Sequence, residues 1–180
     1  MARPRRDWIP GDIYHVFCRG SNRQAIFRYD SDHFDLLECL TRVVAQYELE
    51  CLEFLLMHNH CHYIFRTGEP CLSQAMKALN GRYSLRFNRR HGREAHLFRS
   101  RFGAVLQTSD EQLRSTMRYV VMNPVSAGLC AHPSEWTWSS YRATARLEPA
   151  PVFLATRAAW SFFGDTPEKA AAAYVEFVAG

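Results

Sequence analysis

The chain has 180 residues, 47% of them hydrophobic, and a formal net charge of +4. These totals predict one domain, alone or with an appendage, and exclude a wholly disordered protein. The sequence has no apolar run of about 18 residues and begins MARPRRDWIP, so we expect neither a membrane-spanning helix nor a secretory signal. Its six cysteines include no CxxC pair, which predicts free thiols in a cytoplasmic protein.

Positive charge is concentrated in two segments. Residues 1–28 hold six Arg and two Asp, and residues 82–101 hold seven Arg and one Glu. Their net charges of +4 and +6 leave the rest of the chain at −6. Arginine suits bidentate binding of phosphate and stacking on bases, and aromatic residues occur in both segments. A single arginine-rich helix is as often a solvated face, but two such segments in an otherwise acidic chain favour a nucleic-acid partner.

Hydrophobic spacing predicts the elements of the first half. In chain order we expect a strand at 12–19, a helix at 31–47, strands at 50–58 and 60–66, and a helix at 73–90. In the first strand, Ile13, His15 and Phe17 alternate with their neighbours and share one side. Ser31 or Asp32 is placed to cap the first helix. The two central strands are joined by a tight turn near residue 59.

The second half is expected to add one strand and more helices. In chain order these are a strand at 101–108, a helix at 109–123, a Trp/Ser-rich loop at 135–141 and two short C-terminal helices. Ser109 is placed as the N-cap of the longer helix, and Pro124 is expected to end it. DTPEK supplies a cap and a proline for the last helix.

The order β-α-β-β-α-β predicts an α+β fold. It matches the ferredoxin-like arrangement, in which an antiparallel sheet carries helices on one face. The helix at 109–123 then follows the last strand as an addition. We expect a main domain at 1–142 and a helical C-terminal appendage at 143–180.

The segment MHNHCHYIF contains three histidines at every second position. Alternation along a strand places His60 and His62 on one side and Cys61 on the other. Two imidazoles at this spacing form a possible bidentate metal site, although such a pair alone is more often satisfied by backbone or carboxylate groups. His58 has the same parity, but the turn leaves its orientation open.

The segment RYVVMNP supplies a second group of polar residues. Tyr119 and Asn123 stand four residues apart and share one helix face. Asn123 is a possible third metal ligand through its carbonyl oxygen, or a helix C-cap before the proline. Tyr119 is a possible nucleophile, or a half-buried core aromatic.

Several motifs in order resemble the HUH single-tyrosine transposases, in particular the bacterial branch associated with repetitive extragenic palindromes. The matching segments are GDIYHVFCRGSNRQAIF, MHNHCHYIF, LNGRYSLRFNRRHGREAHLFRSRF, RYVVMNPVSAGL and WTWSSYRA. Two positions depart from the family pattern, with His58 in place of proline and Cys61 in place of a bulky hydrophobic residue. Because cysteine packs as a small hydrophobe, we expect the histidine pair to survive this change.

The resemblance implies roles for four residues. His60, His62 and Asn123 would bind a divalent metal, Mg²⁺ or Mn²⁺, and Tyr119 would be the catalytic nucleophile. Attack on a phosphodiester would leave a 5′-phosphotyrosine and a free 3′-hydroxyl. The implied activity is that of a transposase that nicks and joins DNA, and the implied location is the bacterial cytoplasm at the nucleoid.

The implied substrate is single-stranded DNA that carries a hairpin, bound by a monomer or a homodimer. The arginines that we expect to contact this DNA are Arg5, Arg6, Arg19, Arg23, Arg82, Arg86, Arg89, Arg90 and Arg93. One alternative is a hairpin-binding module without catalysis. Another is a zinc hydrolase that uses His58, His60 and His62, which would leave the arginine-rich segments unexplained.

Overall fold

A computed structural model of the protein describes residues 9–69 and 71–180, so the predicted DNA contacts Arg5 and Arg6 lie outside the described residues. The strands are β1 (Ile13–Arg19), β2 (Leu49–Met57), β3 (His60–Thr67) and β4 (Gly103–Gln107). The helices are α1 (Asp30–Gln46), α2 (Leu72–His91), α3 (Asp110–Ser126), α4 (Tyr141–Thr144), α5 (Thr156–Trp160) and α6 (Pro167–Ala179). Short 3₁₀ turns lie at Ser21–Arg23 and Pro133–Glu135.

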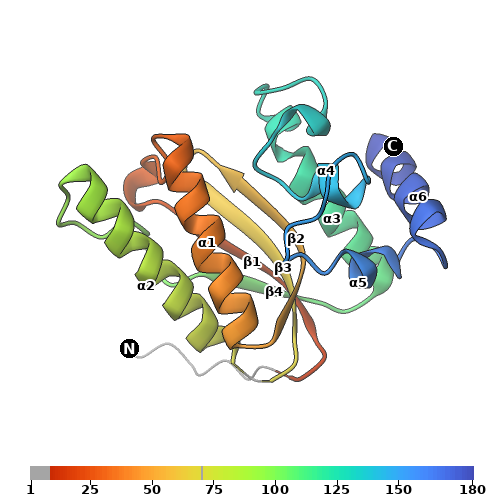
Figure 1. Ribbon diagram of the computed structural model, residues 1–180, viewed down its shortest axis with the longest axis horizontal. Helices are drawn as coiled ribbons and strands as arrows, with labels where there is room; N and C mark the ends of the chain where they lie inside the picture. The colour runs from red at the N-terminus through yellow and green to blue at the C-terminus, as the bar shows by residue number, and fades with distance from the viewer. Residues whose placement is uncertain (1–8, 70) are drawn as a thin grey trace.

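The four strands form one antiparallel sheet in the order β2-β3-β1-β4. This order, with α1 and α2 on one face, confirms the predicted ferredoxin-like fold (Figure 1). The helix α3 lies on the opposite face together with the C-terminal helices (Figure 1). Both faces of the sheet are therefore covered, and this explains why β3 is buried along nearly its whole length.

Each face of the sheet has its own hydrophobic core. Side chains such as Cys61 and Tyr63 of β3 pack against α1 and α2. Leu55 and Ile64 pack on the other face, against residues such as Met117 of α3. The two cores hold the sheet between α1 and α2 on one side and α3 on the other, which fixes the position of α3 over β3.

The helix α3 begins where the sequence predicts but does not end there. The Ser109 hydroxyl accepts a hydrogen bond from the Gln112 backbone N–H at 3.1 Å, which confirms it as N-cap. The expected end at Pro124 is wrong, because the helix continues to Ser126 with the proline inside it. A proline lacks the N–H that would donate to the carbonyl of Val120, four residues earlier. The side-chain Nδ2 of the preceding residue donates to that carbonyl instead, at 3.3 Å.

The cap of α1 also differs from the prediction. Tyr29 is the N-cap, and neither Ser31 nor Asp32 occupies that position. The buried Asp32 carboxylate instead accepts from the backbone N–H groups of Arg28 and Tyr29, at 2.8 and 3.1 Å. An acid at this third helical position fulfils the same need, because it satisfies N–H groups at the start of the helix.

The C-terminal segment packs on the face that also carries α3. In α6 the Thr166 hydroxyl accepts from Lys169 N–H, as the DTPEK motif predicts. The Tyr174 hydroxyl donates to Oε1 of the fully buried Glu53 of β2, at 2.9 Å. The expected boundary between residues 142 and 143 stays a prediction. None of the helices in the described part of the chain is long and apolar enough to cross a membrane.

Candidate active site

The histidine pair lies on the sheet face that carries α3. In the register of the sheet, His62 stands opposite Phe17 of β1 and Leu55 of β2. The imidazole rings of His60 and His62 are 5.1 Å apart between centroids and nearly perpendicular, at 84°. Cys61 points to the other face, as the alternation predicts, and is fully buried there.

A third imidazole from β1 completes this cluster. The Nε2 atom of His15 lies 2.8 Å from Nδ1 of His62, and the two rings stack with centroids 5.1 Å apart. His15 was not among the predicted site residues. The signal that could have found it is the alternation in DIYHVFCR, which already places it with Ile13 and Phe17.

The ring nitrogens of the pair are engaged in a consistent way. His60 Nδ1 lies 2.7 Å from the side-chain Oδ1 of Asn59, and His62 Nδ1 faces His15. An Nδ1–H that donates to these partners leaves the lone pair of Nε2 available on both rings. Histidines that bind metals commonly donate their other ring N–H to such a partner, which fixes the tautomer.

The three imidazoles are held neutral. Burial lowers the pKa of His15 and His60 to about 4. Burial, with the neighbouring charges of His15, His60 and Arg19, lowers the pKa of His62 to about 3. Neutral imidazole is the form that binds a metal ion, so the cluster is ready to bind one at neutral pH.

Tyr119 of α3 lies beside the cluster. Its ring stands edge-on to His62 and His15, with centroids 6.0 and 6.2 Å away. It is 57% exposed, although the neighbouring His62 is buried. The alternative that it is a half-buried core aromatic is therefore wrong, and the structure brings the predicted nucleophile to the predicted ligands.

Asn123 lies one turn further along α3. Its Nδ2 donates to the carbonyl oxygens of Tyr119 and Val120, at 2.7 and 3.3 Å. The alternative role as C-cap is wrong, because the C-cap is Ala127. With Nδ2 held by the helix, Oδ1 is the atom through which this side chain would bind a metal.

The ligand set limits which metal ions fit. Among the described residues, no three His, Cys, Asp or Glu side chains group closely enough to hold an ion. His58 is exposed and packs edge-on against Trp136, and among the described residues it does not join His60 and His62 in a metal site. Imidazole ligands favour borderline ions such as Zn²⁺ or Mn²⁺, whereas an amide oxygen and water favour Mg²⁺ or Mn²⁺.

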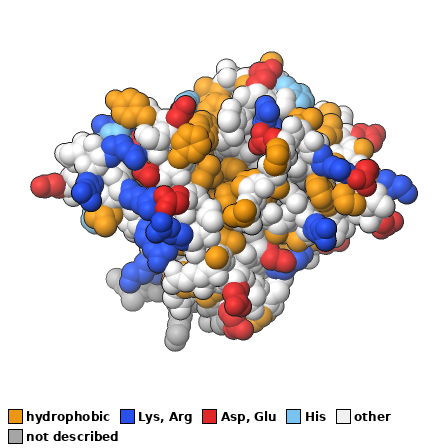
Figure 2. All heavy atoms as spheres, in the orientation of Figure 1, with side chains coloured by type: hydrophobic (Ala, Val, Ile, Leu, Met, Phe, Trp, Pro, Cys, Tyr) orange, Lys and Arg blue, Asp and Glu red, His pale blue; other side chains and the backbone are white. Residues whose placement is uncertain are grey.

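The arginines differ in how they are used. Arg19 stands opposite His60 in the register of β1 and β3, and both Arg19 and Arg23 are exposed. On α2, Arg86 pairs with Glu38 at 2.7 Å, and Arg90 pairs with the buried Asp32 at 2.8 Å. Figure 2 shows Lys and Arg side chains over the side of the molecule that carries α1 and α2, with Asp and Glu side chains among them.

The other predicted arginines of this region have neutral partners or solvent. Arg82 donates to Gln46 at 2.8 Å, and Arg93 donates to Gln24 at 2.7 Å. Arg89 is exposed near the end of α2. DNA contact by each of these residues stays a prediction.

Comparison with known protein families identifies the family to which the chain belongs. The profile of the family described as "Transposase IS200 like" matches residues 11–123, and the chain belongs to this family. This confirms the resemblance to single-tyrosine transposases. A search of curated proteins finds no significant match.

Three solved structures resemble this chain at low sequence identity. A REP-associated tyrosine transposase bound to a REP hairpin is 18% identical, with a TM-score of 0.68 over 86% of this chain and 92% of that one. A putative transposase from Deinococcus radiodurans is 17% identical, with a TM-score of 0.48 over 66% of this chain and 95% of that one. The tRNA(His) guanylyltransferase of Saccharomyces cerevisiae is 9% identical, with a TM-score of 0.51 over 98% and 81%.

Proposed function

We propose that this chain is a metal-dependent single-strand DNA endonuclease and strand transferase that acts at hairpin-forming palindromes through Tyr119. The observation that carries the proposal is the exposed Tyr119 ring 6.0 Å from His62. An exposed phenol beside neutral imidazoles has the access to a phosphodiester that a nucleophile needs. The REP-associated transposase that shares this fold is described as bound to a REP hairpin, which supports hairpin DNA as the substrate.

The residues present fit a divalent ion. Nε2 of His60, Nε2 of His62 and Oδ1 of Asn123 would hold Mg²⁺ or Mn²⁺, with water as the further ligand. When bound, such an ion withdraws charge from the scissile phosphate and orients it for in-line attack. His15 acts through His62, because its hydrogen bond to Nδ1 fixes which nitrogen of that ring is free.

The chemical step is a transfer of the phosphoryl group to tyrosine. The Tyr119 oxygen attacks phosphorus, and the bond from phosphorus to the 3′ oxygen of the preceding nucleotide breaks. The phenol proton passes to water, to which the exposed side chain has access, and the leaving 3′ oxygen takes up a proton from water. The products are a 5′-phosphotyrosine and a free 3′-hydroxyl. Attack by another 3′-hydroxyl on the phosphotyrosine rejoins the strands without a nucleotide cofactor.

Exposed arginines near the cluster would hold the DNA strand. Arg19 adjoins His60, and Arg23 follows it in the next turn of chain. The acids of α1 already neutralise Arg86 and Arg90. We therefore assign the phosphate contacts near the active site to Arg19 and Arg23 before the paired arginines of α2.

A covalent adduct tests the proposal. The wild-type chain is incubated with Mn²⁺ and an end-labelled single strand that contains a hairpin, then denatured and separated by electrophoresis. We expect a labelled protein band that is absent with Tyr119→Phe and absent in EDTA. Tyr29→Phe is the matched control, because Tyr29 is also exposed, at 65%, but lies at the start of α1. A band that persists in Tyr119→Phe would refute the assignment, and binding without any band in the wild type would favour the module without catalysis.

A further inference from the structure

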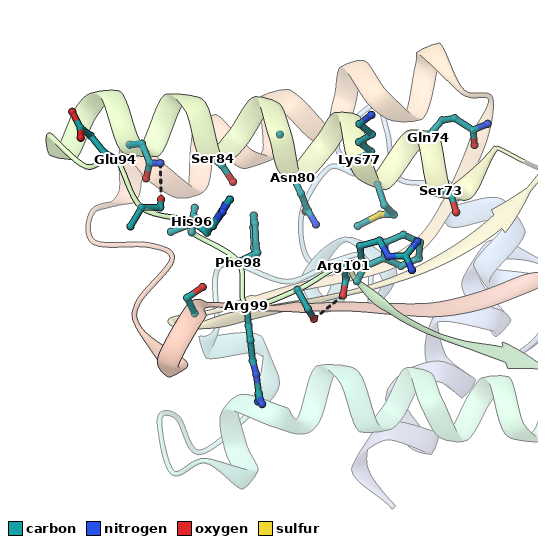
Figure 3. A pocket seen from close by; sticks show the side chains of 18 residues that line it. Ser73, Gln74, Lys77, Asn80, Ser84, Glu94, His96, Phe98, Arg99 and Arg101 are labelled. Carbon is teal, nitrogen blue, oxygen red and sulfur yellow. Dashed lines mark hydrogen bonds between the residues drawn. The ribbon is translucent and has the colours of Figure 1, made fainter. Parts of the chain in front are cut away.

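A second site lies on the opposite face of the sheet from the histidine cluster. It is a cavity of about 1110 Å³ between α2 and the loop of residues 94–102. The side that α2 contributes is mostly polar and includes Asn80 and Ser84, and the loop contributes Phe98 and Arg101. Figure 3 shows Asn80 and Ser84 directed from α2 toward the loop, with Phe98 standing between them and the loop backbone. We call this cavity the α2 groove.

The charge of the α2 groove is positive. Its lining includes the charged side chains of Lys77 and Arg101 but only one acid, Glu94. In the described part of the chain, neither of these two cations forms an ion pair, unlike the arginines that face α1. Unpaired cations around a half-buried aromatic ring are the combination with which proteins bind unpaired nucleotides, because phosphates meet the charges and bases stack on the ring.

The loop connects the α2 groove to the histidine cluster. Backbone hydrogen bonds join it to the end of β1, from Arg99 N–H to Arg19 O and from Ser21 N–H to Leu97 O, both at 2.9 Å. Arg19 in turn stands opposite His60. Figure 3 shows the Arg99 side chain directed away from α2, toward the side of the sheet that carries α3. Neighbouring residues of one loop thus present cations to both faces of the sheet at its edge.

We propose that the α2 groove binds the unpaired DNA strand that flanks the hairpin, after this strand passes over the sheet edge at residues 99–101. The proposal rests on the proposed function for the identity of the DNA. It assigns Lys77 and Arg101 to phosphates and Phe98 to base stacking. A blunt hairpin has no unpaired strand, so the groove selects for tailed hairpins.

Charge reversal at exposed positions tests this selection. Lys77→Glu and Arg101→Glu are compared with Lys169→Glu, an exposed residue of α6 with the same change of charge. The probes are a fluorescent DNA hairpin with a six-nucleotide tail at the 5′ end, the same hairpin with the tail at the 3′ end, and the blunt hairpin. Each substitution is made in the otherwise unchanged chain, and affinities are measured by fluorescence anisotropy. The buffer contains EDTA, which prevents cleavage.

We expect both groove variants to weaken binding of at least one tailed hairpin about tenfold relative to Lys169→Glu, as one reversed charge beside a phosphate implies. Binding of the blunt hairpin should match the control. Equal weakening of tailed and blunt hairpins, or no weakening, would overturn the proposal. The adduct experiment tests a separate claim. A wild-type chain that forms no adduct but shows this selection would refute the proposed function and leave the groove assignment intact.

Discussion

The Asn123 side-chain amide donates a hydrogen bond to the carbonyl oxygen of Val120, the acceptor that Pro124 cannot serve. The same Nδ2 donates to the carbonyl oxygen of Tyr119. One side chain thus continues α3 past a proline and keeps its own Oδ1 directed away from these bonds. The N-P sequence has both a structural and a chemical consequence at the proposed metal site.

Two substitutions of Asn123 separate these consequences. Asn123→Ala removes the donor and the oxygen ligand, so it should lower the free energy of unfolding by about 1 kcal/mol and abolish the adduct. Asn123→Asp keeps an oxygen ligand but loses the donor, so it should lower stability similarly and retain adduct formation. Urea unfolding and the adduct assay measure the two effects. Equal loss of the adduct in both variants would contradict the role of Oδ1 as a ligand.

His15 is predicted to act on the metal site without binding the metal. His15→Ala removes the partner that fixes the His62 ring, so affinity for Mn²⁺ should fall by about 10- to 100-fold. The measurement is the electron paramagnetic resonance signal of free Mn²⁺ during titration of the protein. His96→Ala is the control, because His96 is exposed on the loop beside the α2 groove. Unchanged Mn²⁺ affinity in His15→Ala would remove His15 from the site.

Much of the fold is predictable because its signals are local. Alternation and helical spacing depend on neighbours in the sequence, and the order of elements then gives the ferredoxin-like arrangement. The continuation of α3 past Pro124 is not predictable in this way, because the substitute donor is a side chain, which spacing does not reveal. The partnership of His15 with His62 depends on the pairing of β1 with β3, across 47 positions of sequence.

The number of charges in a segment also does not show which arginines form ion pairs within the fold. Arg90 and Arg99 belong to the same basic segment, yet one binds a buried carboxylate of α1 and the other lies at the sheet edge. The difference arises from the packing of α1 on α2. Only the three-dimensional structure therefore separates the arginines that stabilise the fold from those left for DNA.

This separation predicts opposite effects for two variants. Arg19→Gln should weaken DNA binding and reduce the slope of log affinity against log salt by about 0.7, the value for one phosphate contact on a single strand. Arg90→Gln should leave that slope unchanged and lower the free energy of unfolding by about 1 kcal/mol, because Asp32 loses a partner. Salt titrations of hairpin binding and urea unfolding measure both. A reduced salt slope in Arg90→Gln would show that this residue contacts DNA.

Glu53 makes stability depend on pH. Burial raises the pKa of this carboxyl well above its ordinary value, and the hydrogen bond from Tyr174 offsets only part of that effect. The folded state therefore holds the proton more tightly than the unfolded state. This stabilisation is complete below the ordinary pKa of 4.5 and declines as pH rises toward the folded pKa.

Glu53→Gln removes this titration while it keeps an oxygen acceptor for Tyr174. The stability of the variant relative to the wild type should therefore rise as pH increases above the ordinary pKa of 4.5. Urea unfolding at several pH values measures the difference, with Glu176→Gln on the exposed side of α6 as control. Parallel pH profiles for the wild type and Glu53→Gln would contradict the raised pKa.

The most direct test of the central claim is the position of the covalent bond in the DNA adduct. Digestion with trypsin after Arg118 and Arg142 gives a peptide that contains both Tyr119 and Tyr141, of which Tyr141 is only 1% exposed. Fragmentation of this peptide in a mass spectrometer distinguishes the two. We expect the nucleotide mass on Tyr119, linked through a 5′-phosphate. A nucleotide on any other residue, or linked through a 3′-phosphate, would contradict it.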